Sequence, residues 1–163
     1  MLVFLDIDGV LRPMSAPAGR FHPPCLERFQ SVVRDFEALE IVISSDWRWR
    51  APRQVLLGMF AEDVQQRIIG VTPLLPGSYE GSRYREILAF IEEHRTLGGS
   101  RRVPAGRQWT GEPGQVAWLA IDDSDVLFPS TLLDRHLLLT DPESAFDEAF
   151  EHRVRGFLSR CLP

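Results

Sequence analysis

The chain opens with four consecutive apolar residues, Leu2 to Leu5, which end abruptly in Asp6-Ile7-Asp8-Gly9. A strand that is apolar on both faces needs a cover on each side, and a parallel sheet between two layers of helices provides it. In open sheets of this kind, polar groups and ligands gather at the carboxyl ends of the strands. The opening stretch therefore predicts a buried strand that carries two carboxylates out of the core.

The spacing of the two acids predicts a metal as well as a reaction. Side chains alternate along a strand, but a turn at Gly9 lets Asp6 and Asp8 lean toward one pocket from different depths. Two carboxylates this close repel each other unless a cation lies between them, and oxygen ligands suit a divalent ion such as Mg²⁺. The alternative is a simple Asp-Gly turn between two strands, which leaves Asp6 without a role.

Later segments repeat the pattern of an apolar strand that ends in polar residues. The run from Ile41 to Ile43 ends in Ser44-Ser45-Asp46, and the run from Val116 to Ile121 ends in Asp122-Asp123. A last core strand is expected over His136 to Thr140. Because the carboxyl ends of parallel strands meet at one edge of a sheet, these polar groups should lie near the first acid pair.

The segments between these strands predict helices and connections. Helical spacing of apolar residues indicates helices at 26–36, at 52–60, from Ser82 onward and at 146–158. Residues 12–24 and 70–78 are rich in proline and predict irregular connections. The 163 residues suit a single domain, 1–163. We expect the α/β class, a three-layer α/β/α Rossmann-like fold with a mostly parallel central sheet.

Arginines stand where a helix usually prefers acids. Arg83 and Arg85 lie in the first turn of the helix that begins at Ser82, against the sign of the helix dipole, which indicates that they answer an anion. The alternative is a pair with Glu80 or Glu86 on a solvated face. Residues 97–115 hold glycines, prolines and arginines and predict a flexible loop, which is either simply solvated or able to clamp a nucleic acid.

Composition limits the class of protein further. A net charge of −5 argues against general coating of nucleic acid, although it is compatible with a local basic rim. No apolar run approaches the length of a membrane helix, about 18 residues, so we expect a cytoplasmic protein with no membrane partner. Cys25 and Cys161 lack metal-site spacing, and we expect both to be reduced thiols.

Four of these features, in this order, resemble the motifs of haloacid dehalogenase-like (HAD) phosphohydrolases. Asp6-Ile-Asp8-Gly9 is similar to the first motif, Ile41-Val-Ile-Ser44 to the second, Arg83 to the basic third, and Ile121-Asp122-Asp123 to the fourth. The third is usually lysine, but arginine can fill the role because it binds phosphate bidentately. The segment from Ser44 to Arg48, with the acid pair after Trp118-Leu-Ala-Ile, also resembles HAD domains associated with RNA-repair proteins.

The resemblance implies a role for each matched residue. Asp6 would be the nucleophile that becomes an aspartyl-phosphate, and Asp8 the acid that protonates the leaving oxygen and later the base that activates water. Mg²⁺ would supply the positive charge that attack on an anionic phosphate needs. The implied metal ligands are Asp6, Asp8 through its carbonyl, Asp122 and Asp123. The implied phosphate-binding residues are Gly9, Ser44 and Arg83, with Arg85 as the alternative to Arg83.

The intervals between the motifs leave room for little or no cap. An open site suits a bulky phosphorylated substrate, such as a phosphate monoester at a nucleic-acid end, with Arg12, Arg48 and Arg50 as a basic rim. The competing interpretations are a catalytically degenerate HAD-fold binding module and a receiver-like phospho-accepting regulatory domain. Dehalogenases fit less well because they need neither Asp8 nor a metal. Substrate identity and oligomeric state stay open.

Overall fold

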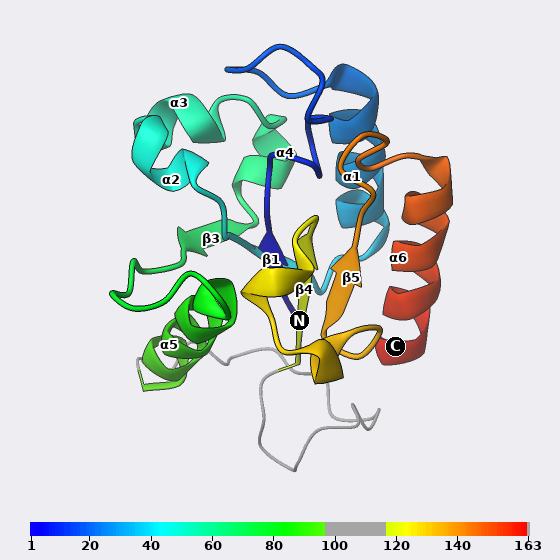
Figure 1. Ribbon diagram of the computed structural model, residues 1–163. Helices are drawn as coiled ribbons and strands as arrows, with labels where there is room; N and C mark the ends of the chain where they lie inside the picture. Colours follow the sequence, from blue (N-terminus) through cyan, green and yellow to red (C-terminus); the bar gives the residue numbers. More distant parts are fainter. Residues whose placement is uncertain (97–116, 163) are drawn as a thin grey trace.

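The computed structural model describes residues 1–96 and 117–162, which build one parallel sheet with helices on both faces (Figure 1). The strand order is β3-β2-β1-β4-β5, and all four pairings are parallel. The strands are β1 (Leu2–Leu5), β2 (Glu40–Ile43), β3 (Ile68–Val71), β4 (Trp118–Asp122) and β5 (Leu137–Leu139). The expected α/β Rossmann-like fold is confirmed.

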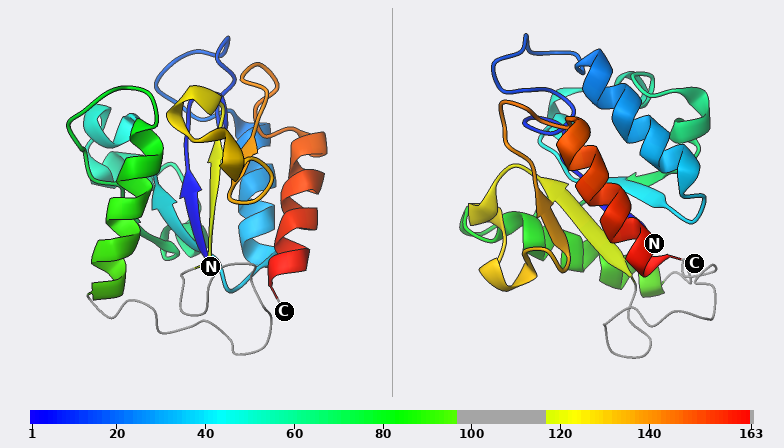
Figure 2. Two further views of the ribbon diagram at one scale, coloured as in Figure 1. Left: turned by 60° about the horizontal axis from the view of Figure 1, so that its bottom comes forward. Right: turned by 90° about the vertical axis from the view of Figure 1, so that its right-hand side faces the viewer.

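Helices connect the strands and cover the sheet. The longer helices are α1 (Pro23–Asp35), α5 (Ser82–Thr96) and α6 (Glu148–Cys161). Three short helices, α2 (Trp47–Arg50), α3 (Arg53–Leu57) and α4 (Glu62–Gln65), lie between β2 and β3, and two 3-10 turns, η1 (Asp125–Leu127) and η2 (Ser130–Leu132), precede β5. Helices α1 and α6 pack side by side on one face of the sheet, whereas α5 covers the other face (Figure 2).

The central strand β1 is buried on both faces. Val3 and Leu5 pack into the core beneath α1 and α6, whereas Leu2 and Phe4 pack into the second core beneath α5. Alternate residues of one strand therefore serve two separate cores. This division explains the unbroken apolar run at the start of the chain, because neither face of the strand meets water.

Strand β3 is absent from the sequence-based prediction, which treats residues 70–78 as an irregular connection. It contains Gly70, and glycine is unusual inside a strand. A Cβ at Gly70 would lie 2.9 Å from the ring of Phe90, so glycine lets α5 pack close to the sheet. The helix expected over 52–60 is also shorter, since α3 spans only Arg53–Leu57. Both differences arise where tertiary packing, rather than local pattern, decides the conformation.

The described parts of the connections between strands contain no separate cap domain. The link from β2 to β3 consists of the three short helices, and the link from β3 to α5 is a ten-residue segment, 72–81, without regular structure. No helix in the described part of the chain is both long enough and apolar enough to cross a membrane. Cys25 and Cys161 are free thiols. The loop expected over 97–115 lies outside the described residues.

Candidate active site

Three carboxylates converge at the carboxyl edge of the sheet. Asp6 directly follows β1, Asp122 is the last residue of β4, and Asp123 follows it. The pairing of the two strands brings them together, because the backbone N–H of Asp6 donates to the carbonyl of Ile121 at 3.0 Å. One oxygen from each carboxylate lies within 4.8 Å of the others. We call Asp6, Asp122 and Asp123 the acidic cluster; all three belong to the metal set expected from the sequence.

The electrostatics of the acidic cluster fit a divalent cation. Burial raises the pKa of Asp6 to about 6, although the charge of Arg83 opposes the shift. Burial and the charge of Asp6 raise the pKa of Asp122 well above its usual value, and burial also raises the pKa of Asp123. A cation among these groups would restore the ionised form of each, and carboxylate oxygens are the ligands that Mg²⁺ takes. The donor set therefore suits the expected metal.

Gly9 gives the acidic cluster its room. Its φ of +70° lies in the left-handed region, and a Cβ there would overlap Oδ2 of Asp123. The turn is held by the N–H of Gly9, which donates to the carbonyl of Arg12 at 2.8 Å, and by Thr140 Oγ1, which donates to the carbonyl of Gly9 at 2.8 Å. Glycine thus lets the turn after β1 lie against the acids that follow β4.

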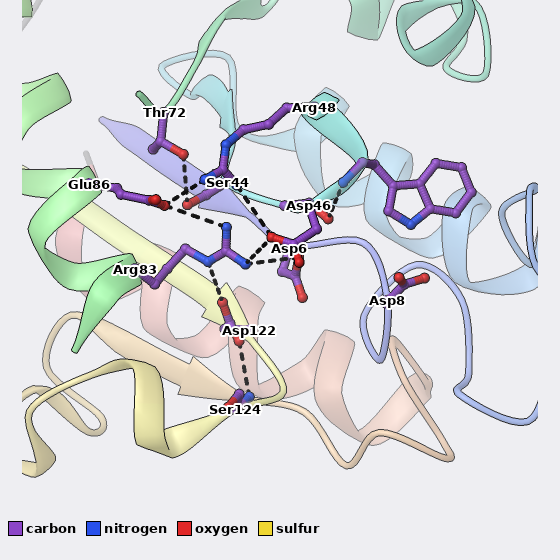
Figure 3. A network of polar contacts seen from close by, with 12 residues as sticks. Asp6, Asp8, Ser44, Asp46, Arg48, Thr72, Arg83, Glu86, Asp122 and Ser124 are labelled. Atoms are coloured by element: carbon purple, nitrogen blue, oxygen red, sulfur yellow. Dashed lines mark hydrogen bonds and ion pairs between the residues drawn. The ribbon is translucent and has the colours of Figure 1, made fainter. Parts of the chain in front are cut away.

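Asp8 lies apart from the acidic cluster, on the side of Asp6 away from Arg83 (Figure 3). Its Oδ1 accepts a hydrogen bond from Arg12 Nε at 2.7 Å. Arg12 is buried and also donates to the carbonyl of Ala16 at 2.6 Å. The loop after β1 thus uses this side chain to hold Asp8. Arg12 also lines the cavity beside Asp8, and its place in a basic rim stays a prediction.

Arg83 is a buried cation that faces the acidic cluster. Ion pairs of 3.6 to 3.8 Å join its guanidinium to the carboxylates of Asp6, Asp46, Glu86 and Asp122. Arg85 turns instead to the backbone and donates to the carbonyls of Ser78 and Glu80. Of the two arginines, only Arg83 faces Asp6. The alternative of a solvated pair does not hold for Arg83, because its side chain is 8% exposed.

Ser44 lies beside the end of β1. Its backbone N–H donates to the carbonyl of Leu5 at 2.8 Å, and its side chain is buried. Thr72, which follows β3, donates through Oγ1 to Ser44 Oγ at 3.4 Å. With Thr72 as the donor, the Ser44 hydroxyl can give its own proton to a ligand. Four neighbouring strands thus place polar groups at one edge of the sheet.

Two acids lie in the site although the sequence analysis assigns them no role there. Glu86, expected only as part of a solvated pair, is buried and accepts a hydrogen bond from Arg48 Nη2 at 2.7 Å. Its spacing of three residues from Arg83 on one helix was the available signal. Asp46 is exposed and lies within 4.0 Å of Arg48 and Arg50. Local sequence carries no signal for this convergence.

The three arginines expected at the basic rim differ in exposure. Arg48 is 3% exposed and pairs with Glu86, so it belongs to the interior of the site rather than to its rim. The Arg50 side chain is 67% exposed, and within the described part of the chain it makes only long ion pairs, of 3.9 Å to Asp8 and 4.0 Å to Asp46. Of the three arginines named for the rim, Arg50 alone is open to solvent.

The fold and the site together define a class of protein. A parallel sheet with an Asp-x-Asp turn after its central strand, and with Ser44, Arg83 and the acid pair of β4 around that turn, is a HAD-like domain. The chain belongs to the family described as the HAD domain in Swiss Army Knife RNA repair proteins, whose model matches residues 2–150. Comparisons with curated proteins and with solved structures found no match. Family membership confirms the resemblance stated above and ties the domain to RNA repair.

Proposed function

We propose that this protein is a Mg²⁺-dependent phosphohydrolase that cleaves phosphate monoesters through an aspartyl-phosphate at Asp6. The observation that carries the proposal is the juxtaposition of a buried cation, Arg83, with three carboxylates that can hold a metal. A phosphate beside Asp6 would meet the positive charge of Arg83 and that of the bound metal. That charge offsets the repulsion between an anionic nucleophile and an anionic substrate.

The first step transfers the phosphoryl group to the protein. A carboxylate oxygen of Asp6 attacks phosphorus, the bond from phosphorus to the leaving oxygen breaks, and Asp8 gives that oxygen a proton. Arg83 neutralises the phosphoryl oxygens, and the free proton of Ser44 donates to one of them. Thr72 serves this step indirectly, because its hydrogen bond orients the Ser44 hydroxyl.

The second step releases the phosphate. Water attacks phosphorus and loses a proton to Asp8, the bond from phosphorus to the Asp6 carboxylate oxygen breaks, and inorganic phosphate leaves with the Asp6 carboxylate restored. Arg12 binds Oδ1 of Asp8, whereas among the described residues Oδ2 has only the 3.9 Å ion pair to Arg50. One oxygen of Asp8 is thus fixed in position, and the other is available to carry the proton.

Mg²⁺ would be held by Asp6, Asp122 and Asp123, with the Asp8 carbonyl as a further ligand implied by the family. When bound, the ion draws negative charge from the phosphoryl group and favours the ionised form of Asp6. Asp122 is oriented for this role, because the backbone N–H of Ser124 donates to its Oδ1 at 3.0 Å. Its Oδ2 lies 3.6 Å from Nε of Arg83.

The proposed substrate is a bulky phosphate monoester of the kind found at a nucleic-acid end. Two cavities adjoin the site: one of about 310 Å³ between α5 and residues 74–79, and one of about 340 Å³ beside Asp8 and Trp47. The described connections leave both open, so a chain can extend beyond the reacting phosphate. The exposed cation of Arg50 adjoins the second cavity. The family's association with RNA repair supports the same substrate.

The direct test is hydrolysis of p-nitrophenyl phosphate with Mg²⁺ and with EDTA. We expect turnover only with Mg²⁺, and a loss in kcat of at least about 10³-fold in Asp6→Asn, because the nucleophile is removed. Asp125→Asn is the matched control: Asp125 is an exposed acid close in sequence to the acidic cluster but outside it, and the variant should keep wild-type activity. A short RNA with a 5′ or a 3′ phosphate then tests the proposed substrate.

Each alternative has its own outcome in this test. A folded protein that binds Mg²⁺ but turns over none of these phosphates would contradict the enzyme and favour a degenerate binding module. A stable phosphoprotein without turnover would favour the receiver-like domain. Equal rates on p-nitrophenyl phosphate and on both RNA ends would remove the case for a nucleic-acid substrate while leaving the phosphohydrolase in place.

A further inference from the structure

Arg48 is a buried cation that the reaction described above does not use. It lies on the short helix α2, and its guanidinium lies 4.7 Å from the centre of the Trp49 ring. One nitrogen, Nη2, donates to Oε2 of Glu86 at 2.7 Å. Figure 3 shows Arg48 and Arg83 reaching Glu86 from two different elements, α2 and α5. Two guanidiniums are thus enclosed within one small region beside Asp6.

Both arginines keep buried nitrogens that have ion-pair distances to carboxylates but no hydrogen bond among the described residues. Nε and Nη1 of Arg48, and the same two atoms of Arg83, make no hydrogen bond with any residue that the structure describes. A buried donor of this kind is costly when it is unsatisfied, more so when it is charged. Glu86 accepts a hydrogen bond from only one nitrogen of Arg48, Nη2. The need to neutralise Glu86 therefore does not explain why Nε and Nη1 are buried without a hydrogen bond. An anionic ligand in the position of the Asp46 carboxylate would give Nη1 of Arg48 an acceptor.

The exposed carboxylate of Asp46 marks where such an oxygen would lie. Its Oδ1 is 4.0 Å from Nη1 of Arg48 and 3.8 Å from Nη2 of Arg83. The same Nη2 is 3.8 Å from Oδ1 of Asp6. An oxygen between the two arginines therefore lies next to the proposed nucleophile. The distances exceed those of hydrogen bonds, and Asp46 can turn away into solvent, so a stronger anion could take its place.

We propose that Arg48 is a second phosphate-binding residue, which together with Arg83 grips the phosphate in place of Asp46, and that Glu86 is the positioning residue for both arginines. The ligand is a tetrahedral phosphate group, whose oxygens suit paired guanidiniums. This inference rests on the proposed function, since the gripped phosphate is the one that Asp6 attacks. It adds a cation that the four motifs of the family resemblance do not contain.

The first test measures the affinity of inorganic phosphate, by calorimetry with Mg²⁺ present, in wild type and Arg48→Met. We expect about tenfold weaker binding in the variant, the size of one lost charged hydrogen bond. Arg160→Met removes an equal charge from the exposed end of α6 and should bind phosphate as the wild type does. Equal affinities in all three proteins would overturn the inference.

A second comparison separates phosphate binding from a purely structural role. If Arg48 only neutralises Glu86, then Arg48→Met should cost nothing once Glu86→Gln has removed that charge, and the double variant should match Glu86→Gln. If Arg48 binds phosphate, the double variant stays about tenfold weaker than Glu86→Gln. Arg48→Lys, which keeps the charge without the fork of nitrogens, gives an intermediate affinity under our proposal and serves if Arg48→Met does not fold.

Asp46→Asn tests the displaced carboxylate. Removing the competing negative charge should tighten phosphate binding, by a few-fold at a site open to solvent. Weaker binding in this variant would contradict the displacement of Asp46. Phosphate affinity is measured without turnover, so the two proposals fail separately: a protein without hydrolysis refutes the enzyme, whereas an active enzyme whose phosphate affinity ignores Arg48 refutes the second arginine.

Discussion

At Asp6, burial and charge act in opposite directions. Burial raises the pKa of the carboxyl to about 6, while Arg83 at 3.8 Å favours the ionised form. The ionisation of the proposed nucleophile therefore depends on which cations are present. Because Asp6 loses its proton near pH 6, both metal binding and the free energy of unfolding should depend on pH.

Without metal, the free energy of unfolding should fall as the pH rises from about 4 to about 6. The folded pKa of Asp6 lies above the value near 4 of an unfolded Asp, so the folded state holds the extra proton in this window. The contribution is fully present below about pH 4, is lost as the pH rises through 6, and is on the order of 3 kcal/mol. Urea unfolding in EDTA measures it.

Asp6→Asn is the control for this pH dependence. It should flatten the decline, and the remaining slope should come largely from Asp122, whose pKa is raised for the same reason. Identical slopes in wild type and Asp6→Asn would show that Asp6 keeps an ordinary pKa in the folded protein.

Gly9→Ala should damage the metal site more than the fold. A non-glycine residue at φ +70° costs about 1 to 2 kcal/mol, and its methyl group would also overlap Asp123. Gly19→Ala is the matched control, because Gly19 has φ +87° but no atom within 4 Å of an added Cβ. Calorimetry should find Mg²⁺ binding at least about tenfold weaker in Gly9→Ala and unchanged in Gly19→Ala. Equal affinities would argue against Asp123 as a ligand.

At the scale of elements, helix ends differ in how far local sequence determines them. Helix α6 is capped by the preceding residue, Asp147, whose side chain accepts a hydrogen bond from the N–H of Phe150 at 2.8 Å. Helices α1, α2, α3 and α4 have no such side-chain cap. The three short helices depend on packing of buried residues such as Trp47, Leu56 and Val64, so their bounds are hard to predict from sequence.

Asp147→Ala should destabilise the protein by about 1 kcal/mol, because the first turn of α6 loses its cap. Asp147→Ser keeps an oxygen that can accept the same hydrogen bond and should restore most of the loss. Chemical unfolding measures the difference. Activity per folded molecule should not change, since Asp147 lies outside the acidic cluster. A reduced kcat in folded Asp147→Ala would indicate that α6 also positions the site.

At the scale of the whole molecule, the site joins β1, β2, β4 and α5. The acidic cluster is built from residues at the ends of β1 and β4. The cation that faces it, Arg83, comes from α5, which covers the face of the sheet opposite α1 and α6. A ligand bound to this edge therefore stabilises the arrangement of the sheet with its helices. Metal binding should be visible in global unfolding.

Mg²⁺ at about 100 times its Kd should stabilise the protein by about 2.7 kcal/mol. For a domain of this size that raises Tm by about 5 to 10 °C. At one fixed Mg²⁺ concentration, the shift should be larger at pH 7.5 than at pH 5, because protons compete with the ion for carboxyls of raised pKa and so raise its Kd. Thermal scans with Mg²⁺ and with EDTA measure it, and Asp122→Asn should lose most of the shift. A shift that is equal in this variant would place the ion elsewhere.

The sequence by itself determined the class of fold and most of the proposed chemistry. An apolar run that ends in Asp6 and Asp8 requires a covered strand with acids at its end, and the same pattern before Ser44 and before Asp122 places those groups at the same edge. These inferences succeed because alternation along a strand and the direction of a parallel sheet are local rules.

Only the tertiary structure decided which arginine faces Asp6 and where the remaining charges lie. Arg83 and Arg85 share one helical turn, and the packing of α5 on the sheet turns the first inward and the second to the backbone. The same packing buries Glu86 and draws Arg48 from α2 to it. Such pairs join residues 38 positions apart, and no local pattern encodes them because their energy depends on burial and on the distance between charges in space.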